Sequence, residues 1–324
     1  ISLSKEEIIQ RIKDKGIVGL GGATFPTHVK LSIPQGKKAE YLIINAVECE
    51  PYLTSDHRLM LEKGEEILIG IQILMKALDV QHTLIGIEAN KPDAIEHLSK
   101  LATKYNGIKV QGLKLKYPQG AEKQLIKALV NREVPSGKLP IEVGCVVQNV
   151  GTAFAVYEAV QFNKPLIDRV VTLSGKNING GNFIVRIGTP IQAMIDKCGG
   201  LPENTEKIIN GGPMMGKALT STEVPVTKGT SGILIFTSEM SHRMPMYNCV
   251  RCGKCVTVCP MGLEPILLEK IAENKNWEMA EKEHILDCIE CGSCHYTCPA
   301  GRPLLDMIRL GKNKVNQLIR SRGK

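Results

Sequence analysis

The stretch CVRCGKCVTVCP, residues 249–260, recurs as CIECGSCHYTCP at residues 288–299. Each copy has three cysteines spaced by two residues, a fourth cysteine after three more, and a proline directly behind it. This run is typical of bacterial iron–sulfur proteins. Thiolates are soft ligands that suit iron–sulfur cores. The repeat therefore predicts two [4Fe–4S] clusters in the last quarter of the chain.

The eight cysteines of the repeat are expected to form two sets that cross between the motifs. The first set is Cys249, Cys252, Cys255 and Cys298, and the second is Cys288, Cys291, Cys294 and Cys259. In this type of run the fourth cysteine ligates the cluster of the other motif. The crossing would therefore tie both motifs into one folded unit.

Two other uses of these cysteines are disfavoured. Disulfides fit poorly, because C-x-x-C spacing gives poor geometry for several bridges and the chain shows no signal peptide. Zinc would need two C-x-x-C pairs rather than a run of four thiols. Three of the eleven cysteines lie outside the repeat and are expected to be small buried hydrophobic residues: Cys49, Cys145 and Cys198.

Length and charge limit the class of protein. A chain of 324 residues predicts two or three domains. The net charge of +8 is mild and does not indicate nucleic-acid binding, but it suits an acidic protein partner or an anionic membrane face. No apolar run reaches the length of a membrane span, which favours a soluble or peripheral protein. Because the chain begins at Ile1, we expect that an N-terminal piece is missing.

The first half of the chain predicts an α/β domain. A helix is expected over SKEEIIQRIKDKG, with Ser4 as its N-cap and Gly16 as its stop. Apolar runs of strand length then alternate with helical patterns, as in EYLIINA, HTLIGIE, IKVQGLK and GCVVQNV. This alternation indicates a parallel sheet over residues 16–163, in a Rossmann-like domain assigned to residues 1–165.

Two further modules are predicted after Pro165. Residues 166–240 carry β-branched runs separated by Gly/Asn turns and one short helical pattern, which indicates a small β-rich module. Residues 241–324 are helical in pattern around both cysteine motifs and show no strand signal. This favours an α-helical dicluster ferredoxin domain over the small β-containing ferredoxin fold.

The segment GLGGATFPTHVK, residues 19–30, is a candidate phosphate loop. Glycines without a Cβ let backbone N–H groups approach an anion, and Lys30 follows at a suitable distance. The spacing is not the G-x-G-x-x-G of the dinucleotide fold, and the loop follows a helix rather than a strand. A tight structural turn with a kink at Pro26 is the alternative.

This loop, together with INAVECEPYLTSDHRLM at residues 44–60, resembles the RnfC family, the C subunits of the Rnf membrane electron-transport complex. More distantly it is similar to the NADH- and flavin-binding subunit of respiratory complex I. The likeness covers essentially the whole chain in order: a flavin domain, a β-grasp module of the SLBB type, and two cluster motifs. The small biotinyl-like domain at the N-terminus of that family is absent from this sequence.

The resemblance implies FMN and NAD(H) sites at positions that match the family's motifs. The glycine loop supplies Gly19, Gly21 and Gly22, with Phe25 near the nicotinamide and Lys30 on the FMN phosphate. The further matching positions are Asn45, Glu48, Tyr117, Gly120, Glu122, Gln148, Asn149 and Thr152.

Four positions depart from the complex I pattern. Val47 replaces an aspartate that contacts the flavin, and Ala121 replaces the first of two glutamates. In the later segment, Gln148 replaces an asparagine and Gly151 replaces a glutamate. Each departure weakens the analogy with complex I at that position. Three of the matching residues are also open to interpretation as turn and helix-cap residues: Tyr117, Asn149 and Thr152.

The resemblance implies a peripheral subunit that moves electrons between NAD(H) and ferredoxin, while partner subunits translocate Na⁺ or H⁺. A flavin converts between two-electron hydride transfer and the one-electron steps of clusters. Hydride transfer needs no general acid or base, so no catalytic residue is assigned. Expected partners are the other subunits, including an iron–sulfur subunit, and ferredoxin, at the cytoplasmic face of the membrane. The alternatives are a soluble electron-transfer protein feeding a reductase, of the proline-reductase-associated type, and a non-catalytic iron–sulfur relay.

Overall fold

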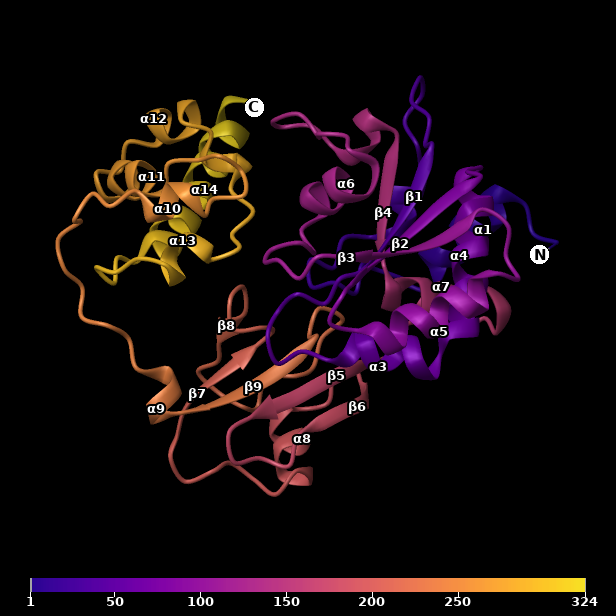
Figure 1. The fold of residues 1–324 in the computed structure, drawn as a ribbon, viewed down its shortest axis with the longest axis horizontal. Coiled ribbons are helices and arrows are strands. Elements are labelled where there is room, and N and C mark those ends of the chain that lie inside the picture. Colours follow the sequence, from indigo (N-terminus) through magenta and orange to yellow (C-terminus); the bar gives the residue numbers. More distant parts are fainter. Residues whose placement is uncertain (1, 324) are drawn as a thin grey trace. The chain divides into compact units, whose positions relative to one another are not determined.

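The computed structural model describes residues 2–323, and the chain divides after Ser238 into two units (Figure 1). The outer ends of the predicted first and third domains, Ile1 and Lys324, lie outside the described residues. The first unit contains two sheets and the second is helical. Each unit is described by itself.

The first sheet has four parallel strands in the order β3-β2-β1-β4. Its strands are β1 (Tyr41–Ala46), β2 (His82–Glu88), β3 (Ile108–Leu113) and β4 (Cys145–Asn149). The four apolar runs of the sequence are these strands, so the prediction of a parallel sheet in a Rossmann-like domain is confirmed. Parallel strands need helical crossovers, which the alternating sequence supplies.

Helices cover both faces of this sheet (Figure 1). One face, with Leu42 and Ile44 of β1, forms the main core with α1 (Lys5–Asp14), α4 (Gly64–Leu78), α5 (Pro92–Ala102) and α7 (Val150–Gln161). Ile43 points to the other face and packs in a smaller core with Leu125 and Ile126 of α6 (Glu122–Val130). Two short helices, α2 (Thr27–Leu31) and α3 (Ser55–Glu62), complete this domain.

The strand order places a switch point between β1 and β4. From β1 the chain proceeds to β2 and β3 on one side, and then returns across the sheet to β4 on the other side of β1. The connections that leave the carboxyl ends of β1 and β4 therefore diverge. In open α/β sheets such a divergence leaves a crevice in which ligands bind.

The second sheet lies in the same unit and has the order β6-β5-β9-β7-β8. Its strands are β5 (Asp168–Gly175), β6 (Gly181–Arg186), β7 (Thr205–Asn210), β8 (Lys217–Ala218) and β9 (Gly232–Thr237). Only the β5–β9 pair is parallel, and α8 (Ile191–Lys197) packs its Ile191 and Ile195 against Val171 and Ile233. The prediction of a β-rich module with one short helix is confirmed.

The second unit contains no β-strand within residues 239–323. Its helices are α10 (Lys254–Thr257), α11 (Pro265–Glu273), α12 (Trp277–Lys282), α13 (Ser293–Tyr296) and α14 (Leu304–Arg322), and α9 (Ser238–Ser241) leads into them. A core around Leu268, Ile285 and Ile308 joins them. The helical prediction is therefore confirmed. In the described part of the chain, no helix combines the length and apolarity that crossing a bilayer requires.

Candidate functional site

The glycine loop is a closed loop that is fastened to the start of α7. The Gly19 N–H donates to the Phe25 carbonyl at 2.9 Å, which closes the loop. The hydroxyl of Thr152, a fully buried residue, accepts the Leu20 N–H at 2.9 Å. Thr152 therefore holds the loop in place, while the Phe25 side chain is 47% exposed beside it. Sequence reasoning placed Thr152 in the site, and the structure shows this supporting contact.

Asn149 joins the loop to the carboxyl end of β4. Its Oδ1 accepts the Gly151 N–H at 2.9 Å as the N-cap of α7, and its Nδ2 donates to Asp56 Oδ2 at 2.8 Å. A Cβ placed on Gly21 would lie 3.6 Å from the Asn149 Cβ, so the loop lies directly on this side chain. The helix-cap interpretation of Asn149 is correct, and the cap stands next to the glycine loop.

The carboxyl end of β1 carries a second group of predicted residues. Asn45 donates from Nδ2 to the Gly120 carbonyl at 2.8 Å, and its Oδ1 accepts the Val47 N–H at 3.1 Å. A Cβ on Gly120 would lie 2.7 Å from the Val47 carbonyl oxygen, so only glycine fits there without a shift. The segment that follows β3 is thereby pinned against the end of β1.

Lys30 and Glu122 meet at the same edge of the sheet. The Lys30 Nζ lies 2.5 Å from Glu122 Oε1 and donates to the Val147 carbonyl at 3.0 Å. Both side chains are about one-third exposed, at 31% and 37%. The ammonium group is therefore already paired, but both side chains remain accessible to a ligand.

Glu48 has a role that sequence reasoning missed. Its carboxylate accepts the Asp56 N–H at 2.8 Å and the His57 N–H at 3.1 Å, which caps the N-terminus of α3. Burial, followed by the nearby Asp56 carboxylate, raises the pKa of Glu48 to about 7. The helix itself was also missed. Glu48 therefore fixes α3 against the end of β1, and whether it also contacts a cofactor stays a prediction.

Three further charged residues, which the sequence analysis did not assign to the site, reach this region. Burial raises the pKa of Asp56, while Asn149 and the Arg169 guanidinium oppose the rise. Arg169 comes from β5 and donates to the Leu20 carbonyl at 3.2 Å, and burial lowers its pKa to about 10. Lys91 Nζ lies 3.1 Å from Glu88 Oε2 in a buried pair at the end of β2. The cations partly balance the carboxylates beneath the loop.

The raised pKa of Glu48 predicts a pH dependence of stability. A carboxyl group with a raised pKa keeps its proton in the folded chain at pH values where the unfolded chain has released it. The stabilisation is therefore fully present below the ordinary value of 4.5 and is lost as the pH rises toward about 7.

Glu48→Gln is expected to flatten this dependence. Between pH 4.5 and 7, the wild-type free energy of unfolding should fall relative to that of the variant by about 1–3 kcal/mol. Urea unfolding at several pH values measures both curves. If the free energy of unfolding changed with pH equally in both proteins, the raised pKa of Glu48 would be contradicted.

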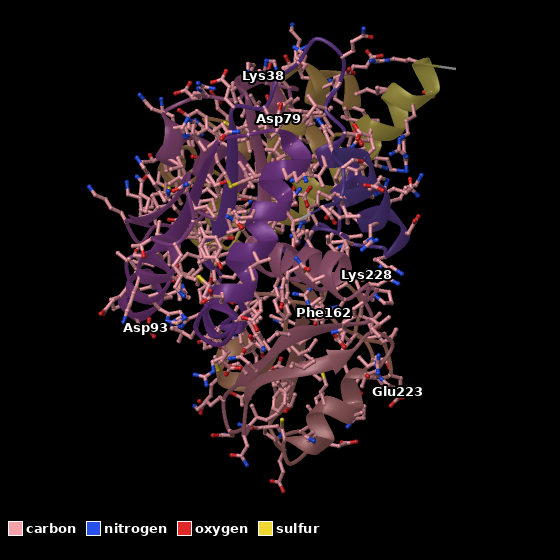
Figure 2. The ribbon with its side chains drawn as sticks, turned by 90° about the vertical axis from the view of Figure 1, so that its right-hand side faces the viewer. Lys38, Asp79, Asp93, Phe162, Glu223 and Lys228 are labelled. Carbon is pink, nitrogen blue, oxygen red and sulfur yellow. The ribbon has the colours of Figure 1, made fainter. Side chains whose placement is uncertain are left out.

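The β-rich module forms hydrogen bonds with segments at the edge of the first sheet where the predicted site residues lie. The Glu50 carboxylate accepts the backbone N–H groups of Met214 at 3.0 Å and Met215 at 2.8 Å, and Tyr117 hydrogen-bonds to it. Any side chain on Gly212 would overlap this carboxylate. Lys228, labelled in Figure 2, donates from the module to the Gly16 carbonyl at 2.6 Å. The loop and the end of β1 are thus both anchored to the module.

The residues at this edge fit a flavin mononucleotide. Gln148 is 2% exposed at the end of β4, and its Nε2 has no hydrogen-bond partner among residues 2–323. A buried amide donor without a partner is costly, and a bound polar group would satisfy it. A Cβ on Gly22 would meet nothing within 4 Å, so the loop borders open space. Lys30 supplies the positive charge that a phosphate requires.

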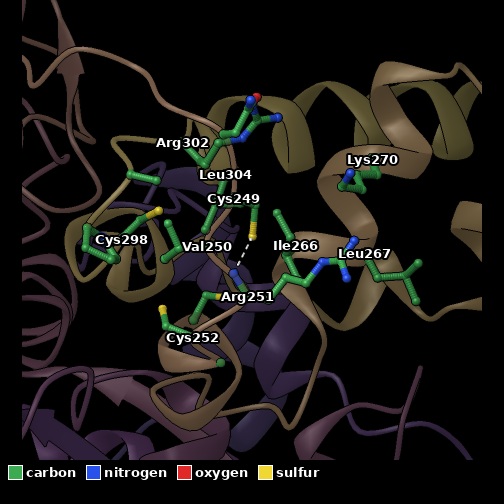
Figure 3. A pocket seen from close by; sticks show the side chains of 15 residues that line it. Cys249, Val250, Arg251, Cys252, Ile266, Leu267, Lys270, Cys298, Arg302 and Leu304 are labelled. Carbon is green, nitrogen blue, oxygen red and sulfur yellow. Dashed lines mark hydrogen bonds between the residues drawn. The ribbon is translucent and has the colours of Figure 1, made fainter.

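The second unit gathers the eight cysteines of the repeat around two cavities. The larger, of about 620 Å³, is lined by Cys249, Cys252, Cys255 and Cys298 (Figure 3). The smaller, of about 20 Å³, is lined by Cys259, Cys288, Cys291 and Cys294. The structure thus groups the thiols in the same two sets as the crossed pattern does.

The donor chemistry of both sets fits [4Fe–4S] clusters, because each set offers four soft thiolates. Within residues 2–323, no three His, Cys, Asp or Glu side chains converge tightly enough to hold one ion. A cubane cluster instead presents separate iron atoms to separate thiolates, so its four ligands surround a volume. Of the other cysteines, Cys145 and Cys198 are buried as expected, whereas Cys49 is only half-buried, beside Gly120.

Three family models match the chain in the order of its modules. The model of the Nuo51 FMN-binding domain matches residues 12–158, the SLBB domain residues 170–218, and the 4Fe-4S dicluster domain residues 245–299. The predicted order of a flavin domain, an SLBB module and a dicluster domain is therefore confirmed, and with it the prediction of FMN and two [4Fe–4S] clusters.

Curated relatives match most of the chain. The C subunit of the proton-translocating ferredoxin:NAD(+) oxidoreductase complex of Clostridium ljungdahlii is 50% identical over 87% of this chain and 62% of its own length. The C subunit of the Na(+)-translocating complex of Acetobacterium woodii is 47% identical over 97% of this chain and 71% of its own. The C subunit of the ion-translocating oxidoreductase complex of Rhodobacter capsulatus is 45% identical over 81% of this chain and 51% of its own length. The chain thus spans between about half and about seven-tenths of these relatives' lengths.

A solved structure shares the fold. A chain of the NAD⁺-reducing [NiFe]-hydrogenase in the H₂-reduced state superposes with a TM-score of 0.64 at 19% identity. The match covers 96% of this chain and 63% of that chain. At this level of identity the likeness supports the fold alone.

Proposed function

This chain belongs to the RnfC family, the C subunits of Rnf-type ion-translocating ferredoxin:NAD⁺ oxidoreductase complexes, and we propose that it is the peripheral subunit that exchanges electrons with NAD(H). In this proposal it passes electrons between NAD(H) and ferredoxin through FMN and two [4Fe–4S] clusters. Partner subunits, among them an iron–sulfur subunit, translocate Na⁺ or H⁺. The chain then works at the cytoplasmic face of the membrane.

One observation carries this proposal. A single chain combines a matched FMN-binding domain, whose predicted residues meet at the switch point of a parallel sheet, with two cavities that each gather four cysteines. A flavin accepts a hydride from a nicotinamide and passes single electrons to clusters, so this pairing suits an exchange between NAD(H) and one-electron carriers.

The chain's own residues bind and orient the cofactor. The backbone N–H groups of the glycine loop and the Lys30 ammonium are proposed to hold the phosphate, and the buried Gln148 amide a polar group of the flavin. Asn45 and Asn149 fix the ends of β1 and β4, so the two walls of the site keep their spacing. Phe25 is exposed beside the loop and is proposed to stack near the nicotinamide.

The cysteine sets are proposed to ligate the clusters as the crossed pattern assigns them. Each set draws on both motifs, and the motifs are separated in the chain by α11 and α12. Ligation would therefore fix these helices and α14 relative to one another. The second cavity is lined by apolar side chains, among them Leu268, Leu305 and Ile308, and two of its cysteines, Cys291 and Cys294, are buried.

Anaerobic titration of the purified chain with NADH tests the proposal. Visible absorbance should show flavin bleaching, and low-temperature EPR should then show reduced [4Fe–4S] signals. Clusters that dithionite reduces but NADH does not, even with FMN supplied, would overturn the NAD(H) assignment and indicate an iron–sulfur relay. An active chain that does not co-purify with membrane subunits would instead indicate a soluble electron-transfer protein.

A further inference from the structure

The two cysteine cavities differ sharply in their surroundings. The first is lined by Arg251, Lys270 and Arg302 and by no acidic residue, and Cys252 is exposed at it. The second is lined by cysteine, glycine, proline and apolar side chains, without a charged residue. Cys291 and Cys294 in that cavity are 7% and 8% exposed. Cys259 and Cys288 in it are half-buried, so the first cavity, with its exposed Cys252, is the more open of the two to a macromolecule in solution.

The mouth of the first cavity carries a net positive charge. Figure 3 shows Arg251 on the cysteine loop and Lys270 on the helix across the cavity, and Lys254 is exposed just after the lining residue Gly253. None of these three side chains forms an ion pair within residues 2–323. The nearby acids Glu269 and Glu273 are both paired with Arg302, so these two acids offset only part of the charge and the six side chains together keep a net charge of +2.

Exposed apolar side chains lie on the same segments of the chain as these cations. Val250 is 65% exposed on the cysteine loop, and Val256, Val258 and Leu267 are between 36% and 39% exposed. An exposed apolar surface rimmed by like charges is the usual composition of a protein-docking site. Weak electron-transfer encounters use small interfaces of this kind, in which charge guides the approach.

We infer that the cluster held by Cys249, Cys252, Cys255 and Cys298 is the external electron port of this chain, and that the basic patch Arg251, Lys254 and Lys270 docks an acidic iron–sulfur protein over it. The inference rests on the proposed function for the cluster itself. It adds which of the two clusters exchanges electrons with the partner, and by which side chains. The Cys288 set, which is lined by apolar residues and includes the buried Cys291 and Cys294, then serves as the internal cluster.

Binding to an acidic bacterial-type [4Fe–4S] ferredoxin tests the port. Oxidised ferredoxin is titrated into the full chain by calorimetry at low and high salt. The triple variant R251E/K254E/K270E should bind at least about tenfold more weakly at low salt, and the difference should shrink at high salt. Because both proteins stay oxidised, the result does not depend on NADH, and failure of the NAD(H) assignment is seen separately in the NADH titration.

A matched control reverses three exposed cations of the same domain that line neither cavity, K282E/K314E/R320E. This variant changes the net charge equally and should bind ferredoxin within about twofold of the wild type. If both triple variants bound ferredoxin equally weakly, the effect would come from net charge and the proposed docking patch would be wrong. Dithionite-reduced EPR spectra of all three proteins check that both clusters are present.

Zero-length carbodiimide cross-linking of the unaltered chain gives an independent readout. It joins lysines to carboxylates, so ferredoxin should be cross-linked at Lys254 and Lys270. Cross-links confined to lysines remote from the first cavity would overturn the port. If the chain formed no cross-links with ferredoxin but bound anionic phospholipid vesicles in a charge-dependent way, the patch would be a membrane-binding surface instead.

Discussion

Replacing Cys298 by alanine is expected to abolish the cluster of the first motif, although Cys298 lies in the second. Cys298 lines the same cavity as Cys249, Cys252 and Cys255, whereas the other thiols of its own motif line the second cavity. Without a fourth thiolate the first cluster should be lost and the second retained. Iron and acid-labile sulfide should therefore fall to about half of the wild-type content.

The spectrum of the remaining cluster decides between crossed and uncrossed pairing. With crossed pairing, Cys252→Ala and Cys298→Ala should leave the same low-temperature EPR spectrum, and Cys259→Ala should match Cys291→Ala. Cys198→Ala, a buried cysteine outside the repeat, should keep both clusters. If Cys298→Ala instead matched Cys291→Ala, each motif would hold its own cluster and the crossed assignment would be wrong.

This loss should also interrupt electron flow. A chain of carriers transfers no electrons past a missing member, so reduction of an external iron–sulfur acceptor by NADH should fall by more than about tenfold in Cys298→Ala. Flavin bleaching by NADH should persist, because the first unit contains the flavin domain and is a separate folded body. Loss of bleaching as well would show that the variant disturbs more than its cluster.

Local patterns were enough to predict the fold of both sheets and of the helical unit. The run CVVQN of β4 is apolar up to its last two residues and is followed at once by helical periodicity, so strand and helix were both predicted. Helix α3 was missed, because its SDHRLMLE sequence is short and largely polar. Its N-terminus is capped by Glu48, which lies seven residues before Ser55. A cap that distant is not a local sequence signal.

The site was only partly predictable, for a similar reason. The family resemblance assigned both Asn45 and Asn149 to the cofactor site, and the structure brings them together because their parallel strands pair at their carboxyl ends. Arg169 was not expected, because it donates to Leu20 across a separation of 149 residues, from the neighbouring module. The Lys30–Glu122 pair joins positions 92 residues apart, and both were assigned to the cofactor rather than to each other.

Replacing Gly22 by alanine is expected to cost the chain most of its affinity for FMN. Gly22 has a φ of +106°, which L-residues rarely adopt, and its added Cβ would meet no atom within 4 Å. Any loss of FMN therefore arises from the altered loop backbone and from the space into which the methyl group points. Backbone N–H groups must approach a phosphate closely to bind it, so the dissociation constant for FMN should rise at least about tenfold.

Gly188→Ala separates this effect from backbone strain. Gly188 has a φ of +98° and likewise nothing within 4 Å of an added Cβ, but it lies between β6 and α8 of the β-rich module. Both variants should lose a similar free energy of unfolding, about 1–2 kcal/mol, because both force a residue with a Cβ into the same region. Urea unfolding measures that shared loss, and quenching of FMN fluorescence by apo-protein measures affinity. Only Gly22→Ala should bind FMN more weakly; equal affinities in the two variants would show that the loop is a structural turn and that the flavin phosphate lies elsewhere.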